Sequence, residues 1–189
     1  GYFPEDKLQG YRKIGSELFL SGHPHPKTPG VEIASGSLGQ GLSVAHGIAL
    51  GARIDKLNYN VYVVLGDGEI QEGQIWEAAM SAAKFNSNNL TAIIDNNKVA
   101  QDNLTEDLKN IEPLVDKWEA FGWDTYRING HNMEEIMSTL LIPKHSVKPR
   151  LIIADTIKGK GVSFMEGNKS WHGIAPSEND LNKALTELE

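Results

Sequence analysis

The chain has 189 residues, enough for one domain of ordinary size, with no cysteine and a net charge of −7. The lack of cysteine excludes disulfides, thiolate metal sites and cysteine nucleophiles, and the negative charge argues against a general nucleic-acid surface. Hydrophobic residues make up 40% of the chain, as in soluble globular proteins, and the longest apolar run (residues 61–65) is too short to span a membrane. We therefore expect a cytoplasmic protein without nucleic-acid or membrane partners.

The first part of the chain predicts little regular structure before one helix rich in small residues. Residues 4–19 indicate a short helix, because Pro4 stands at its start and acidic residues follow it. Residues 21–30 hold three prolines and two glycines and predict a loop. The glycine-rich stretch 36–41 opens an apolar helix over about residues 40–56, whose many alanines and glycines indicate close packing.

From residue 61 onward, short β-rich runs alternate with helical stretches. Strands are predicted over residues 61–65, 90–94, 124–128 and 150–157. Helices are predicted over residues 70–85, 111–121 and 132–141, and after the Ser177–Asp180 capping pattern. Strands separated by helices indicate right-handed βαβ units. The predicted fold class is therefore open α/β, with a mainly parallel sheet and helices on both of its faces.

Polar turns follow two strands of this predicted sheet. Asp67 stands between two glycines after the first strand, and Asn97 follows the second strand thirty residues later. Ligands of open parallel sheets bind beyond the carboxyl ends of the strands, so both side chains should lie at one edge. A carboxylate and an amide oxygen suit Mg²⁺, which completes its shell with phosphate oxygens, and a helix start near Ile70 would offer free N–H groups. The pattern predicts a metal-bridged diphosphate, although each turn alone is also an ordinary turn signal.

The stretch from Gly66-Asp67-Gly68 to Asn97 resembles the thiamin diphosphate motif, which links Gly-Asp-Gly to an asparagine at this distance. Further stretches narrow the resemblance to transketolase: Gly22-His23-Pro24, Gly36-Ser37-Leu38-Gly39-Gln40-Gly41, and Thr156-Ile157-Lys158-Gly159-Lys160-Gly161 with Ser170-Trp171-His172-Gly173. The resemblance covers nearly the whole chain. It implies the thiamin diphosphate-binding fold of the N-terminal, diphosphate-binding (PP) domain.

The resemblance implies a ligand set for a metal and for the cofactor. Asp67 and Asn97 would ligate Mg²⁺ or Ca²⁺, with the backbone carbonyl of Val99 as a third ligand. Cofactor contacts are implied for Gly36, Leu38, Gly66, Gly68, Gln101, Lys158 and His172. Within this set, Gly36 and Leu38 would hold the aminopyrimidine through their backbones, and Gly68 would donate its N–H to the diphosphate.

His23 and His172 are the catalytic residues that the resemblance implies. Histidine suits proton transfer because its pKa lies near neutrality. Both histidines stand in polar, glycine-containing segments, so a solvated loop position is the alternative for each, and it is the expected position for His25. We expect His46, on the small-residue helix, to be a hydrogen-bonded packing residue.

Two residue pairs on the predicted helix 70–85 have other expected roles. Glu72 and Glu77 would lie at a dimer interface by resemblance, although five residues apart they could equally be solvated charges. Trp76 and Met80 are four residues apart and are expected in the core rather than against a cofactor.

The implied reaction moves a two-carbon ketol unit from a ketose phosphate to an aldose phosphate, as in the pentose phosphate pathway. Family members complete the site with a glutamate of a pyrimidine-binding (Pyr) domain and with histidines that precede the stretch present here. We therefore expect residues 1–189 to be one PP domain, incomplete at its N-terminus. It would work with a C-terminal Pyr-domain partner, in a homodimer or a heterotetramer.

Three alternatives stay open. The chain could be a non-catalytic cofactor-binding or assembly module, or an inactive fragment that keeps the fold. It could also be another thiamin diphosphate enzyme, such as 1-deoxyxylulose-5-phosphate synthase, although the stretch at residues 36–41 fits transketolase better. Ile174 follows the His-Gly pair where some relatives have a lysine, so no phosphate contact is implied there.

Overall fold

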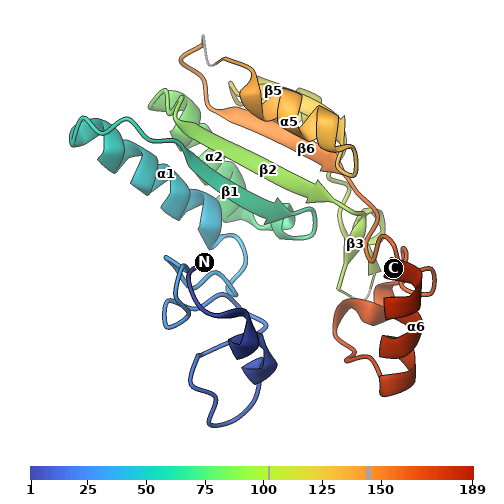
Figure 1. Cartoon of the computed structure of the whole chain (residues 1–189). Coiled ribbons are helices and arrows are strands. Elements are labelled where there is room, and N and C mark those ends of the chain that lie inside the picture. Colours follow the sequence, from blue (N-terminus) through green and yellow to red (C-terminus); the bar gives the residue numbers. More distant parts are fainter. Residues whose placement is uncertain (102, 144–145) are drawn as a thin grey trace.

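The computed structural model describes residues 1–101, 103–143 and 146–189. Its centre is a four-stranded parallel sheet with the strand order β1-β2-β6-β5, shown in Figure 1. The strands are β1 (Val61–Gly66), β2 (Leu90–Asn96), β5 (Asp124–Asn129) and β6 (Arg150–Asp155). The predicted parallel α/β fold is confirmed.

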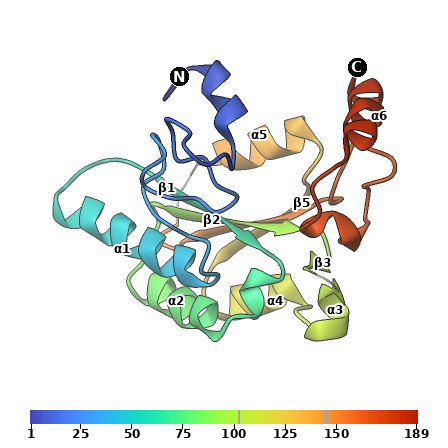
Figure 2. The ribbon, with the colours of Figure 1, turned by 90° about the horizontal axis from the view of Figure 1, so that it is seen from below.

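Helices cover both faces of this sheet (Figure 2). One face carries α1 (Gln40–Ile54), α2 (Gly73–Lys84) and α4 (Leu114–Ala120), and the other carries α5 (Met133–Leu141). The remaining elements are η1 (Glu5–Gly10), η2 (Glu69–Gln71), β3 (Val99–Ala100), β4 (Asn103–Leu104), α3 (Thr105–Leu108), η3 (Lys169–His172) and α6 (Glu178–Leu188). Among the described residues, no helix has the length and apolar character needed to cross a membrane.

The core lies between the sheet and the face that carries α1, α2 and α4. Trp118 and Trp123 are fully buried there, their rings meet edge to face at 4.9 Å, and the indole N–H of Trp123 donates to the backbone carbonyl of Ala79 at 3.0 Å. Trp76 packs on this cluster as expected, whereas the prediction for Met80 was wrong, because its side chain is 52% exposed. The large aromatic area buried here stabilises the face of the sheet that supports the strand ends.

The predicted helix over residues 4–19 was wrong. Only η1, a six-residue 3-10 helix with no buried residue, forms there. The acidic first turn favours a helix start, but the apolar side chains Leu8, Tyr11 and Ile14 are exposed rather than packed on the core. In addition, Arg12 and Gly15 have positive φ angles of 54° and 79°. Helix formation without a buried face gains little from tertiary packing.

Several other boundaries differ from the predicted ones; the helix predicted over residues 111–121, for example, begins at Leu114. The helix expected to start near Ile70 begins at Gly73 instead, after the short η2 turn. The last strand ends at Asp155, two residues before the predicted end. The capping box of α6 is confirmed, because the hydroxyl of Ser177 accepts from the backbone N–H of Asp180 and the carboxylate of Asp180 accepts from that of Ser177.

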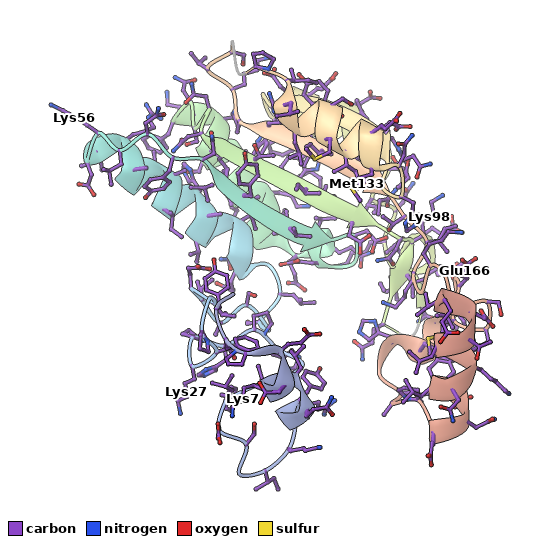
Figure 3. The ribbon with its side chains drawn as sticks, viewed as in Figure 1. Lys7, Lys27, Lys56, Lys98, Met133 and Glu166 are labelled. Atoms are coloured by element: carbon purple, nitrogen blue, oxygen red, sulfur yellow. The ribbon has the colours of Figure 1, made fainter. Side chains whose placement is uncertain are left out.

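Two segments extend from the sheet on the same side (Figure 1). One is the N-terminal segment, residues 1–39, and the other is the C-terminal segment, residues 158–189. They remain apart in both views, with Lys7 and Lys27 labelled on the first and Glu166 on the second in Figure 3.

Candidate functional site

Asp67 is a buried carboxylate at the end of β1. The residue is only 1% exposed, and its two side-chain oxygens accept backbone N–H bonds from Gly68 at 2.7 Å and from Lys98 at 2.5 Å. Burial raises the pKa of Asp67; these N–H bonds partly oppose the rise, and the charge of Asp95 adds to it. A buried acid of this kind is stabilised in its charged form by a nearby cation.

The turn after β2 meets the turn after β1, as the parallel strand order requires. Asp67 donates its backbone N–H to the carbonyl of Asp95 at 3.3 Å. Asp95 also accepts the side-chain N–H of Asn97 at 3.0 Å and a hydroxyl bond from Thr156. Asp95 therefore orients the amide of Asn97. This role was not predicted from the sequence, although Asp95 directly follows the predicted strand 90–94.

Asn97 and Val99 complete the polar turn. The side-chain oxygen of Asn97 accepts the backbone N–H of Val99 at 3.0 Å, and Val99 is buried. Within the described residues no cluster of three His, Cys, Asp or Glu side chains could hold a metal. The predicted ligands differ from such a cluster, because they are one carboxylate (Asp67), one amide oxygen (Asn97) and one backbone carbonyl (Val99). Such a set suits a hard cation that takes its other ligands from phosphate and water.

Gly68 is required by close packing. A Cβ atom on Gly68 would lie 2.8 Å from the Cβ of Ala100, on the short β3–β4 hairpin. A Cβ on Gly66 would meet nothing closer than 3.7 Å. Gln101 stands beside Ala100 at the turn of the hairpin and is exposed, with a φ of 51°. The hairpin thus rests directly on the turn that holds Asp67.

The glycine-rich loop at residues 36–41 brings His23 and Gly36 together. A Cβ on Gly36 would lie 2.9 Å from the Cβ and Cγ atoms of His23. His23 is exposed, as is Leu38 at 57%. Gly39 adopts a φ of 85°, which glycine tolerates best, immediately before α1.

Glu69 connects this loop to the end of β1. Its two carboxylate oxygens accept the backbone N–H groups of Gly39 and Gly66, each at 3.0 Å. Sequence reasoning did not identify Glu69. Its position inside the Gly-Asp-Gly-Glu stretch is the available signal, but only the fold shows that the loop lies within reach.

Lys158 and His172 follow β6 in the chain, whereas the loop at residues 36–41 precedes β1. Lys158 is half-buried and lines a depression of about 510 Å³ together with Asn97, Lys98 and His131. Its charge lowers the pKa of Asp67, against the larger effect of burial. His172 ends η3 in the C-terminal segment and is exposed. No hydrogen bond or ion pair joins it to another of the predicted site residues that the structure describes.

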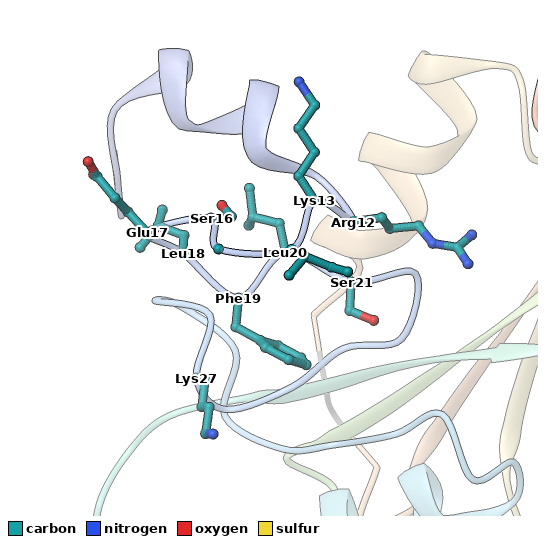
Figure 4. Close-up of a pocket in the computed structure, with 11 residues that line it drawn as sticks. Arg12, Lys13, Ser16, Glu17, Leu18, Phe19, Leu20, Ser21 and Lys27 are labelled. Atoms are coloured by element: carbon teal, nitrogen blue, oxygen red, sulfur yellow. The ribbon is translucent and has the colours of Figure 1, made fainter.

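Another depression, of about 560 Å³, lies in the N-terminal segment (Figure 4). It is lined by residues 12–21 and by Lys27. None of the predicted site residues lines it, and its walls come from one largely exposed loop. The predicted site residues therefore all lie outside this depression.

An ionic network ties the strand ends together beside the site. Arg127 donates to both carboxylate oxygens of Asp155, at 2.8 and 2.9 Å, and to Glu112 at 3.0 Å, while Asn96 donates to Asp155 at 2.6 Å. Burial raises the pKa of Asp155, but the hydrogen bonds from Arg127 and Asn96 outweigh it and hold the pKa below its usual value. Asp155 therefore stays charged and fastens β2, β5 and β6 at their ends.

His46 is a packing residue, as expected. It is 6% exposed, and its two ring nitrogens lie 3.1 Å from the hydroxyls of Ser81 and Ser87. Burial and the positive charge of Arg53 lower the pKa of His46, so the ring is neutral in the folded protein near pH 7. His25 accepts a backbone N–H from Lys27 at 3.1 Å and packs on Phe19, which agrees with a loop position.

Known proteins similar to this chain match it over nearly its whole length. The family model described as transketolase, thiamine diphosphate binding domain, matches residues 2–188. The chain is 45% identical to an apulose-4-phosphate transketolase subunit of Phocaeicola vulgatus and covers 66% of that protein. It is 43% identical to the 6-deoxy-6-sulfo-D-fructose transketolase subunit SqwG of Clostridium sp. and covers 69% of it. In each case the whole chain is aligned.

Longer relatives match over the same stretch. The human transketolase is 39% identical, with all of this chain and 30% of that protein aligned. The crystal structure of the Campylobacter jejuni transketolase superposes with a TM-score of 0.89 at 35% identity, covering 97% of this chain and 30% of the other. The chain thus spans about two thirds of the subunit relatives and under a third of the transketolases.

Proposed function

Because the chain belongs to the transketolase family, in its thiamine diphosphate-binding domain, we propose that it takes part in transfer of a two-carbon ketol unit from a ketose phosphate to an aldose phosphate. The observation that carries this proposal is the buried Asp67 carboxylate beside Asn97 at two neighbouring strand ends. Thiamin diphosphate, when bound, supplies the carbon–carbon bond chemistry that protein side chains lack. Residues 1–189 would form its PP part.

The metal end of the site is proposed for Asp67, Asn97 and the carbonyl of Val99, with Mg²⁺ or Ca²⁺ as the cation. The raised pKa of Asp67 supports this, since a bound cation would stabilise the buried charge. The cation would share its remaining positions with diphosphate oxygens and water. Gly68 donates to Asp67 in this structure, so its proposed bond to the diphosphate requires that donor to be shared or turned.

The organic end of the cofactor is proposed for the backbones of Gly36 and Leu38, with Gly66, Gln101 and Lys158 lining the rest. Supporting this, the loop that holds Gly36 is hydrogen-bonded through Glu69 to the end of β1. Lys158 contributes a positive charge close enough to lower the pKa of Asp67, and such a charge would also attract a diphosphate.

His23 and His172 are proposed to hold and move protons of the substrates, with His172 also touching the cofactor. Both are exposed, on the two segments that extend from the sheet. Imidazole groups exchange protons near neutral pH, which suits this task. Their exposure leaves room for groups supplied by another subunit.

The proposed partner is a C-terminal Pyr-domain subunit, in a homodimer or a heterotetramer in the cytoplasm. The names of two relatives describe them as transketolase subunits, which supports a divided enzyme. Those names mention apulose 4-phosphate and 6-deoxy-6-sulfo-D-fructose. The substrates to be assayed should therefore include these two sugars as well as the sugar phosphates of the pentose phosphate pathway.

Calorimetry with thiamin diphosphate and Mg²⁺ tests the cofactor proposal. Wild type should bind, and Asp67→Ala should weaken binding by at least about 100-fold, because a metal ligand and a buried charge are lost together. Asp116→Ala, an exposed carboxylate in α4, is the matched control and should bind as wild type does. Binding that survives Asp67→Ala would contradict the proposed metal site.

Assay with a Pyr-domain subunit tests the reaction. The mixture should transfer a ketol unit, and His172→Ala should lower kcat by about 10²–10⁴-fold. Cofactor binding without activity in the presence of any such subunit would favour a non-catalytic module instead.

A further inference from the structure

Glu69 connects two parts of the site that no other described side chain joins directly. We propose that Glu69 is a positioning residue that fixes the distance between the loop at residues 36–41 and the Gly-Asp-Gly turn, so that both ends of one cofactor are gripped together. The inference rests on the proposed function, because the two parts are the proposed aminopyrimidine and diphosphate ends.

Glu69 bridges the backbone N–H groups of Gly39 and Gly66, and this arrangement is called the clamp below. One oxygen of Glu69 accepts the N–H of Gly39 and the other accepts the N–H of Gly66, each at 3.0 Å. Gly39 precedes Glu69 by thirty residues in the chain. The side chain is half-buried, which strengthens hydrogen bonds relative to those in open water. Gly66 directly precedes Asp67, and Gly39 directly follows Leu38, so the clamp ends one residue from a proposed ligand on each side.

Neighbouring contacts hold the loop and the start of α1 against Glu72 and α2, not against the Gly-Asp-Gly turn. The Cβ of Glu72 lies 3.0 Å from where a Cβ of Gly39 would be, and the amides of Gln40 and Gln74 donate to each other, each at 3.0 Å. These contacts keep the start of α1 near α2. Glu69 differs from them because it alone reaches the end of the strand that carries Asp67.

Only a carboxylate of this length fits the clamp. Both partners are N–H donors, and a carboxylate is an acceptor on both oxygens. In Glu69→Gln the amide nitrogen would face one N–H donor, so one bond would be lost. In Glu69→Asp the charge stays, but the shorter side chain cannot span both partners.

The first readout needs no ligand. Amide hydrogen exchange, followed by NMR in the purified protein, should speed up about tenfold or more for at least one of the Gly39 and Gly66 amides in each of Glu69→Gln and Glu69→Asp, as expected for loss of a bond to a charged acceptor. Glu119→Gln, an exposed carboxylate on α4, is the matched control and should leave both rates unchanged. Unchanged exchange in both Glu69 variants would overturn the clamp.

The second readout separates positioning from general support of the site. Calorimetry with Mg²⁺ and thiamin diphosphate should show an affinity loss of about tenfold or more in both variants. Magnesium pyrophosphate, which probes the metal end alone, should bind within about twofold of wild type. Equal losses for both probes, or no loss for either, would overturn the inference. A wild type that does not bind thiamin diphosphate would instead overturn the proposed function, and this inference with it.

Discussion

The strand ends and the two flanking segments differ in how far they bury the proposed site residues. At the strand ends, Asp67 is 1% exposed and each of its oxygens accepts a backbone bond. In the flanking segments, His23 and His172 are exposed and stand on loops or a short 3-10 turn. The part proposed to hold the metal is thus built by the sheet itself, while the proposed proton-handling groups lie where another chain could complete their surroundings.

This contrast indicates that cofactor binding and catalysis rest on different kinds of structure. The sheet fixes Asp67 and Asn97 through strand order, so their positions require only that the core folds. The histidines depend on segments with little buried surface. Perturbing the core should therefore change the strand ends strongly, and perturbing the segments should leave them nearly intact.

The largest expected effect comes from the core beneath the strand ends. Trp123→Ala should lower the free energy of unfolding by about 3–5 kcal/mol, because it removes a fully buried indole and its bond to Ala79. Phe19→Ala, in the N-terminal segment, should cost less than about 1 kcal/mol, since that ring is 47% exposed. Chemical denaturation measures both. Similar costs for the two variants would contradict the contrast between the regions.

Two glycines should respond differently to the same added methyl group. Gly68→Ala should cost about 1–3 kcal/mol, because its Cβ would lie 2.8 Å from the Cβ of Ala100 on a packed hairpin. Gly36→Ala would meet the Cβ and Cγ atoms of His23 at 2.9 Å, but both residues lie on exposed loops whose backbone can shift, so the cost should be smaller. Thermal unfolding of the pair checks the order, and the reverse order would show that the loop is the more rigid part.

The ionic network tests how much the charges at the strand ends contribute. Arg127→Met should destabilise the fold by about 1 kcal/mol, since the side chains of Arg127 and Asp155 remain 35% and 40% exposed and water screens their attraction. The pKa of Asp155 should rise when its main partner is removed. NMR titration of the Asp155 carboxyl measures that rise, and an unchanged pKa would exclude Arg127 as its cause.

The smallest expected effect is a pH dependence from His46. Its pKa is lowered in the folded protein, so the unfolded chain takes up a proton first as the pH falls through about 6.5. Stability should then decrease with falling pH, with a slope no steeper than about 1.4 kcal/mol per pH unit for one proton. His46→Gln should remove that part of the slope, which denaturation between about pH 5 and pH 8 would show. Identical slopes would assign the effect to other groups.

The sequence was informative wherever strand order alone decides position. The turns that carry Asp67 and Asn97 meet because parallel strands end at one edge, and this requires no knowledge of side-chain packing. Glu69 could not be found this way, because its bond to Gly39 depends on how the loop returns to β1. The helix expected at residues 4–19 failed because local preferences were read without a buried face to support them.

The strand order also has a consequence for how the chain folds during synthesis. β2 pairs with β6, although β5 precedes β6 in the chain, and the bond between Asn96 and Asp155 joins residues 59 positions apart. Pairings this distant slow folding, because a long loop must close before they form. The edge that carries Asn97 can therefore take its final form only after residue 155 has left the ribosome, so this edge matures later than the pairing of β1 with β2.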